Sequence, residues 1–186
     1  MHEPFDAPRS SPVRRRRPLA AILLISAVAA VGCANPVVPF QLSIVPDAQV
    51  FPKDWRVWGV AVNGLYGVQR EVKGLDIGPF NDTTESLMGL SAGVANIGRG
   101  DVYGLHLGVG NSVDGGYMGS QVGFVNHVGG ALHGFQIGLG NVAGEGAGLQ
   151  LGVVNQTSSM KGLQIGLLNF NSKGWLPFFP FFNFGF

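Results

Sequence analysis

Residues 162–169 read GLQIGLLN, and this short pattern recurs along most of the chain. Each clear copy begins with a glycine, at Gly74, Gly89, Gly104, Gly119, Gly134, Gly148 and Gly162. Each copy ends with an asparagine, at Asn81, Asn96, Asn111, Asn126, Asn141, Asn155 and Asn169. Successive first glycines are 15, 15, 15, 15, 14 and 14 residues apart, and a degenerate copy starts 15 residues earlier at Gly59. This near-constant period indicates a repeat architecture in which each unit is completed by its neighbours.

Apolar residues alternate within each copy, as in Leu163, Ile165 and Leu167. A period of two is typical of a β-strand, and interior glycines at this density disfavour a helix by about 1 kcal/mol each. We therefore predict an all-β chain whose aliphatic residues face a core. The intervening positions are mostly glutamine and glycine, and they are expected to form a polar outer face.

Two β architectures fit a unit of 14 or 15 residues. In a parallel β-solenoid each unit is one coil, and identical residues stack about 4.8 Å apart in ladders. In an antiparallel β-meander each unit is one strand plus a turn, and the sheet can close into a small β-barrel. The solenoid is favoured, because a bend at the glycine would turn the apolar residue two places before it inward as well. The asparagine suits a second corner and a hydrogen-bonded ladder.

Residues 177–186, PFFPFFNFGF, keep the barrel open as the alternative. Alternating apolar residues that end in Phe are typical of outer-membrane β-barrels. However, Pro177 and Pro180 cannot donate hydrogen bonds in a central strand, and the linkers between units are uniformly short. We therefore interpret this segment as an aromatic cap on the last unit. Residues 37–45, VVPFQLSIV, are expected to cap the first unit.

The N-terminal sequence predicts export. Residues 14–17 are all arginine, and the 13 residues 19–31 are uncharged and rich in Ala, Leu, Ile and Val. A bilayer span needs about 20 residues, so this segment fits a signal peptide better. It ends in AVGC, which resembles the lipobox of bacterial lipoproteins, where the thiol of Cys33 would accept diacylglycerol. Cys33 is the only cysteine, so no intramolecular disulfide is possible. The alternative is an ordinary signal peptide cleaved near Ala34.

These features divide the chain into a signal peptide at 1–32, a linker and capping strand at 33–54, a repeat domain at 55–172 and an aromatic capping strand at 173–186. Cleavage would leave seven basic and nine acidic residues, a net charge of about −2, which gives no electrostatic basis for binding nucleic acid. We expect secretion across the inner membrane and attachment to the outer membrane through the N-terminal lipid. The repeat domain would then face the periplasm or the outside.

The string GLQIGLLN, the preceding PFQLSIVP and the closing PFFPFFNF resemble the bacterial surface repeat proteins of the leptospiral type, whose tandem units read roughly GLQIGLVN. The resemblance covers residues 39–186. It implies a location in the cell envelope and transfers no catalytic residue. The chain departs from the pattern at Pro79, Ala92 and Ser120, where larger aliphatic residues are typical.

Titratable residues are few and scattered. His106, His127 and His133 do not obviously converge, whereas a zinc or copper site needs three or four ligands in close geometry. Asp101 and Asp114 lie in glycine-rich turns but do not recur in every unit, as a calcium-binding roll would require. We therefore predict no enzymatic activity, no cofactor and no metal. The expected role is structural or adhesive, with the polar face binding an envelope or extracellular protein or a glycan; the alternative is a small outer-membrane β-barrel protein.

Overall fold

The computed structural model describes residues 36–186, so the predicted signal peptide and Cys33 lie outside the described residues. The described chain forms strands and contains no helix. The strands are β1 (Val37–Val45), β2 (Ala48–Gln49), β3 (Arg56–Asn63), β4 (Tyr66–Ile77), β5 (Phe80–Ala92), β6 (Ala95–Gly98), β7 (Asp101–Leu107), β8 (Gly110–Val113), β9 (Tyr117–Val122), β10 (Val125–Ile137), β11 (Gly140–Leu151), β12 (Val154–Asn171) and β13 (Phe178–Gly185).

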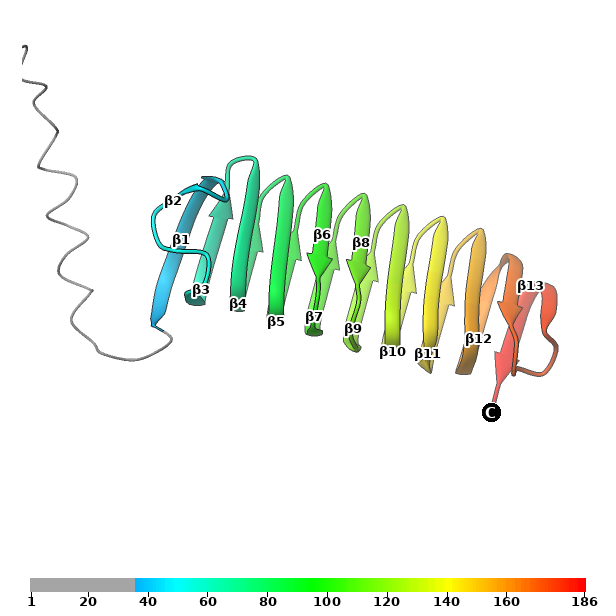
Figure 1. The fold of residues 1–186 in the computed structure, drawn as a ribbon. Helices are drawn as coiled ribbons and strands as arrows, with labels where there is room; N and C mark the ends of the chain where they lie inside the picture. The colour runs from blue at the N-terminus through cyan, green and yellow to red at the C-terminus, as the bar shows by residue number, and fades with distance from the viewer. Residues whose placement is uncertain (1–35) are drawn as a thin grey trace, which may run out of the picture. The chain divides into compact units, whose positions relative to one another are not determined.

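Each repeat unit forms one coil of a parallel β-solenoid with about nine turns (Figure 1). Equivalent residues pair in register from coil to coil. Gly134, for example, aligns with Gly119 on one side and with Gly148 on the other. The predicted solenoid is therefore confirmed, and the alternative antiparallel meander is wrong.

Each coil contains two extended segments that lie on opposite sides of the interior. The longer one carries the motif glycine, and we call it the glycine segment; β7 and β9 are examples. The shorter one carries the motif asparagine, and we call it the asparagine segment; β6 and β8 are examples. In β10, β11 and β12 an asparagine segment continues into the next glycine segment as one strand.

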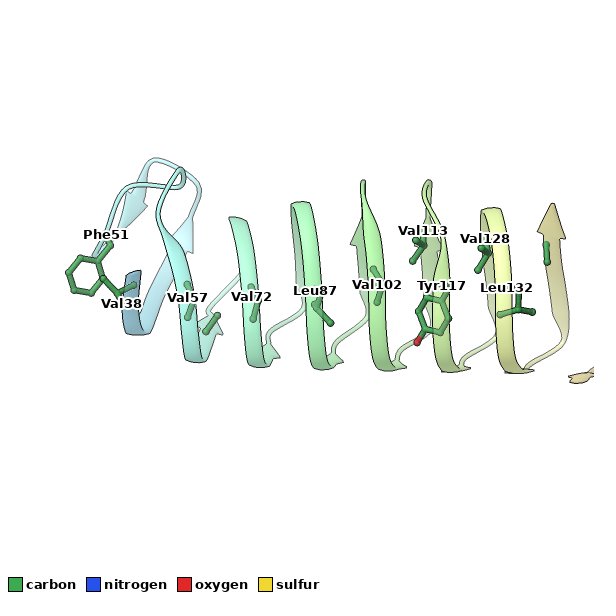
Figure 2. Packing of buried hydrophobic residues seen from close by; sticks show 12 residues of the cluster. Val38, Phe51, Val57, Val72, Leu87, Val102, Val113, Tyr117, Val128 and Leu132 are labelled. Carbon is green, nitrogen blue, oxygen red and sulfur yellow. The ribbon is translucent and has the colours of Figure 1, made fainter. Parts of the chain in front are cut away.

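The apolar core is a narrow row inside the coils. It is formed by the apolar residues two places before every motif glycine except Gly148, where Gly146 takes this position, together with Val113, Val128 and Ala143 from the asparagine segments. The residues before the glycines are Val57, Val72, Leu87, Val102, Tyr117, Leu132 and Met160. Figure 2 shows most of these side chains in a line that follows the solenoid. All of them are almost completely buried.

The rest of the interior is polar, which reverses the predicted orientation of the units. The motif glutamines are buried, namely Gln121, Gln136, Gln150 and Gln164. The residues that follow two of them, Ile137 and Ile165, point to the opposite side and are 42% and 40% exposed. The prediction that the alternating aliphatic residues face the core is wrong. The predicted glutamine-rich outer face is also wrong. The alternation of inward and outward side chains continues through the motif glycine, so each glutamine lies on the same side as the buried residue two places before that glycine.

The motif glycines hold a backbone conformation that other residues avoid. Gly134 has a φ of 137°, and a Cβ on it would lie 1.9 Å from the carbonyl oxygen of Gly119. Gly104 and Gly119 show the same two features. The predicted special backbone position therefore exists, but of the apolar residues around it only the one two places before the glycine lies inward. The aliphatic residues after it remain outside.

Both ends of the stack are covered by short additional structure. β1 pairs in parallel with β3, and β2 folds back against β1. Nearby, Phe51 is buried and stacks on Trp55. At the other end β13 pairs antiparallel with β12, and Trp175 stacks on Phe184 with ring centroids 5.0 Å apart.

Candidate interaction surface

The motif asparagines form a continuous hydrogen-bonded ladder in the interior. From Asn81 to Asn155, the Nδ2 of each one donates to Oδ1 of the asparagine in the next coil, at 2.8–2.9 Å, and the last acceptor is Asn169. Asn63, which is not a motif asparagine, begins the ladder by donating to Asn81 at 2.7 Å. From Asn81 onward the second Nδ2 hydrogen goes to a backbone carbonyl at the neighbouring corner, such as Ile137 O for Asn126. Both amide hydrogens are thus used, so burial leaves no unsatisfied donor in these side chains.

The motif glutamines form a second ladder, which runs in the opposite direction. Nε2 of Gln164 donates to Gln150, Gln150 to Gln136, and Gln136 to Gln121, at 2.7–2.8 Å. Gln136 also donates across the interior to Val142 O at 3.1 Å. The asparagine donors point toward the C-terminal end and the glutamine donors toward the N-terminal end, so the dipoles of the two ladders oppose each other.

Different residues occupy the glutamine position in the earlier coils. Asp76, Ser91 and His106 stack there in consecutive coils, and each is at most 1% exposed. Ser91 Oγ donates to Asn96 and not to His106, and neither ring nitrogen of His106 has a hydrogen-bond partner among the described residues. These three side chains are therefore not connected as a catalytic triad would be, and solvent does not reach them.

Burial shifts the titration of two of these groups. It raises the pKa of Asp76 to about 7, although a hydrogen bond from Asn63 opposes the shift. It lowers the pKa of His106 to about 4. His106 packs edge-on against Tyr117, with ring centroids 5.5 Å apart. His106 occupies a position of the predicted polar outer face, and its burial is part of the same reversal of the strand.

A buried carboxylate lies near these residues, on the asparagine segment of β5. Asp82 is 1% exposed and accepts two hydrogen bonds from Arg99, at 2.7 and 3.1 Å, and a third from Tyr66 at 2.8 Å. The hydrogen bond to Asp82 raises the pKa of Tyr66. The carboxylate is thus fully engaged in holding neighbouring coils together.

The outer side of the glycine segments carries the aliphatic residues, because the glutamine ladder occupies the inner side. We define the aliphatic face as three rows along the solenoid. The first row follows the motif glycine and contains Val60, Leu75, Leu90, Leu105, Ser120, Phe135, Leu149 and Leu163. The second contains Val62, Ile77, Ala92, Leu107, Val122, Ile137, Leu151 and Ile165. The third lies at the corner and contains Val94, Val109, Phe124, Leu139, Val153 and Leu167.

The corner row is the most exposed part of this face. Phe124, Leu139 and Leu167 are 58%, 53% and 57% exposed. A shallow groove of ≈ 700 Å³ runs between the second row and the corner row, lined by side chains that include Val122, Phe124, Ile137, Leu139, Leu151 and Val153. Its walls are aliphatic or aromatic, so its chemistry suits a hydrocarbon surface and not a polar ligand.

Most charged side chains lie away from the aliphatic face, although Lys73 and Lys161 stand in the row next to it. The turns between an asparagine segment and the next glycine segment form a charged edge, which contains Arg70, Glu85, Arg99, Asp101, Asp114 and Glu145. Within residues 36–186, no charged side chain belongs to the three aliphatic rows. The solenoid is therefore amphipathic across its section.

Neither a metal site nor a membrane-spanning helix is found in the part of the chain that the structure describes. No group of three or more His, Cys, Asp or Glu residues there is placed to hold a metal ion. No helix in the same region is long and apolar enough to cross a membrane. Comparisons with protein-family models, curated proteins and solved structures give no match.

Sequence reasoning found the repeat residues but missed the aliphatic face. The deciding signal is parity within the strand, which the predicted bend at the glycine set aside. Leu132, Gly134 and Gln136 differ by two positions and so share one side, while Phe135 and Ile137 share the other. The first side is the buried one, and it contains the motif glycine. A Cβ added at this glycine would clash with the backbone of the preceding coil.

Proposed function

We propose that this protein is a non-enzymatic lipoprotein of the bacterial cell envelope, and that its β-solenoid serves a structural or binding role there. The N-terminal sequence predicts secretion and acylation of Cys33. The resemblance to bacterial surface repeat proteins supports the same location.

The observation that carries the binding role is the outward display of aliphatic rows over many coils. Soluble monomers rarely expose a contiguous apolar patch larger than about 300–600 Å² unless it contacts another molecule. The interior ladders fix the spacing of these rows, so the surface is rigid and regular. A structural or binding role therefore fits the geometry, with the aliphatic face as the contact surface in place of the glutamine-rich face predicted from the sequence.

The proposed absence of catalysis is supported by the burial of the titratable ladder residues. Asp76 and His106 are enclosed between coils, and Asp82 is saturated by Arg99 and Tyr66. The proposed role requires no cofactor, metal or nucleic acid.

Metabolic labelling with palmitate tests the lipid anchor. The wild-type chain is expected to incorporate label and Cys33→Ala to incorporate none. Ala34→Ser, which keeps the cysteine, is the matched control and is expected to remain labelled. Label that persists in Cys33→Ala contradicts acylation at this residue. Protease treatment of intact cells then distinguishes surface display, in which the solenoid is cleaved, from a periplasmic location, in which it is protected.

A further inference from the structure

We propose that the aliphatic face lies on a lipid bilayer, with the solenoid axis parallel to the membrane and the charged edge in water. This inference rests on the proposed function only for bringing the chain to a membrane. The contact itself follows from the geometry of the described residues.

The aliphatic face is large and flat. Eight glycine segments, from Gly59 to Gly162, span roughly 34 Å at about 4.8 Å per coil, and the six residue steps from the position before the glycine to the corner span roughly 20 Å. The three aliphatic rows and the row that borders them together cover roughly 700 Å², which is above the size of about 300–600 Å² typical of the largest apolar patch on a monomer. The end strands extend it, since the exposed Phe40 and Leu42 align with Val60 and Val62.

The border of this face carries side chains suited to a membrane–water interface. The row immediately before the motif glycines contains Trp58, Lys73, Met88, Tyr103, Met118, His133, Ala147 and Lys161. Trp and Tyr are enriched at headgroup level, and Lys extends its ammonium group into water while its stem contacts lipid. Lys73 lies 4.5 Å from the ring centre of Trp58, so these two groups already share one site at the border.

The short stretch of sequence between Cys33 and β1 allows this orientation. Cys33 precedes Val37 by four residues, which reach at most about 14 Å. Val37 aligns with Arg56, which lies two positions, or roughly 7 Å, before the border residue Trp58. The acyl chains on Cys33 and the border row can therefore reach the same bilayer surface.

The corner row favours lipid over a second copy of this chain. Its side chains stand at the turn between the two segments of each coil, beyond the flat part of the face. A second flat solenoid packed on the first and second rows would leave Phe124 and Leu139 uncovered, whereas fluid hydrocarbon covers both regions. On the asparagine segments the outward positions mix polar residues, such as Ser112 and His127 at 3.4 Å from each other, with exposed apolar ones, such as Val125. The apolar rows on that side are therefore interrupted, and the more continuous aliphatic face is assigned to lipid.

Depth measurement on the full chain tests the contact. Leu139→Cys places a fluorophore on the corner row, and Asp114→Cys places it on the charged edge as the matched control; both positions are exposed. Each labelled chain is reconstituted into phosphatidylethanolamine and phosphatidylglycerol vesicles that contain lipids brominated on the acyl chain. We expect quenching to be at least about fivefold stronger at position 139 than at 114. Circular dichroism should show the same β spectrum for both variants.

Equal and weak quenching at the two positions overturns the proposal. A blue-shifted emission at position 139 without quenching by brominated lipid, together with energy transfer between labelled chains, also overturns it and assigns the face to a second copy. As a control, the parent chain without an added cysteine is treated with the same label, which reacts only if the Cys33 thiol is free. If the parent chain is labelled, Cys33 is not acylated and the lipid anchor of the proposed function is contradicted. The comparison of positions 139 and 114, repeated in a Cys33→Ser background, then tests the lipid contact separately.

Discussion

Asn126 donates a hydrogen bond from Nδ2 to Oδ1 of Asn141 at 2.9 Å, and both side chains are completely buried. The same relationship recurs along the ladder, so each buried amide is satisfied by its equivalents in the neighbouring coils. Burying an amide without partners costs free energy, but a fully bonded ladder removes that cost. The interior of this solenoid can therefore be polar, and its aliphatic side chains are left outside.

Replacement of Asn126 by alanine should destabilise the solenoid by about 2–4 kcal/mol, because the donor on Asn111, the acceptor on Asn141 and the carbonyl of Ile137 lose their partner. The free energy of unfolding from urea titration measures this. Val125→Ala removes the exposed neighbouring side chain and should change stability by less than about 0.5 kcal/mol. Similar losses in the two variants would contradict a structural role for the ladder.

Gly134→Ala should cost about 2–5 kcal/mol, since it combines a positive φ with a Cβ 1.9 Å from Gly119 O. Gly140→Ala is the control, because nothing lies within 4 Å of the added Cβ and its φ is not positive. It should stay within about 0.5 kcal/mol of the wild type. Thermal melting of both variants provides the comparison, and a tolerated Gly134→Ala would show that the backbone path at the motif glycines is wrong.

The buried carboxyl of Asp76 predicts a loss of stability toward neutral pH. Its pKa of about 7 in the folded state exceeds the ordinary value of 3.8, so the folded chain binds this proton more tightly than the unfolded chain. Stability should therefore fall as pH rises from about 4 to about 7. Asp76→Asn should remove this contribution and stabilise the protein at pH 8, as measured by urea unfolding across that range. An unchanged pH profile in the variant would mean that Asp76 is solvated.

His106 predicts the opposite dependence. Burial lowers its pKa from 6.5 to about 4, so the unfolded chain takes up the proton first and stability should fall as pH decreases from about 6.5 to about 4. His106→Gln should abolish this loss and extend the glutamine ladder by one position next to Gln121, with a gain of about 1 kcal/mol. The exposed His133→Gln serves as the control in the same titration. A larger effect from His133→Gln would contradict the burial of His106.

The sequence was sufficient to predict the repeat and the strands, because the regular spacing from Gly74 to Gly162 and the alternation within each copy constrain both. It favoured parallel coils but left the antiparallel meander as an alternative, since both architectures fit a unit of this length. It also predicted the asparagine ladder, since in a parallel stack identical side chains lie about one strand spacing apart. The orientation of the strands could not be obtained by assuming that aliphatic residues face inward. That assumption fails when Gln136 and Gln150 satisfy each other along the stack.

The candidate surface was missed for the same physical reason. Hydrophobicity alone assigned Phe135 and Ile137 to the core, and the polar side chain between them to solvent. The hydrogen bonds that reverse this assignment join residues 14 or 15 positions apart, so they appear only after the coils are stacked. The titratable residues at the glutamine position, Asp76 and His106, gave no local indication of burial.

Thiol reactivity along one strand tests the orientation of the units most directly. In a Cys33→Ser background, single cysteines at Phe135, Gln136 and Ile137 are treated with maleimide under native conditions. We predict fast labelling at positions 135 and 137, and labelling at 136 that approaches their rate only after unfolding. Fast labelling at position 136 with protection at 135 and 137 would place the aliphatic residues in the core and contradict the polar interior.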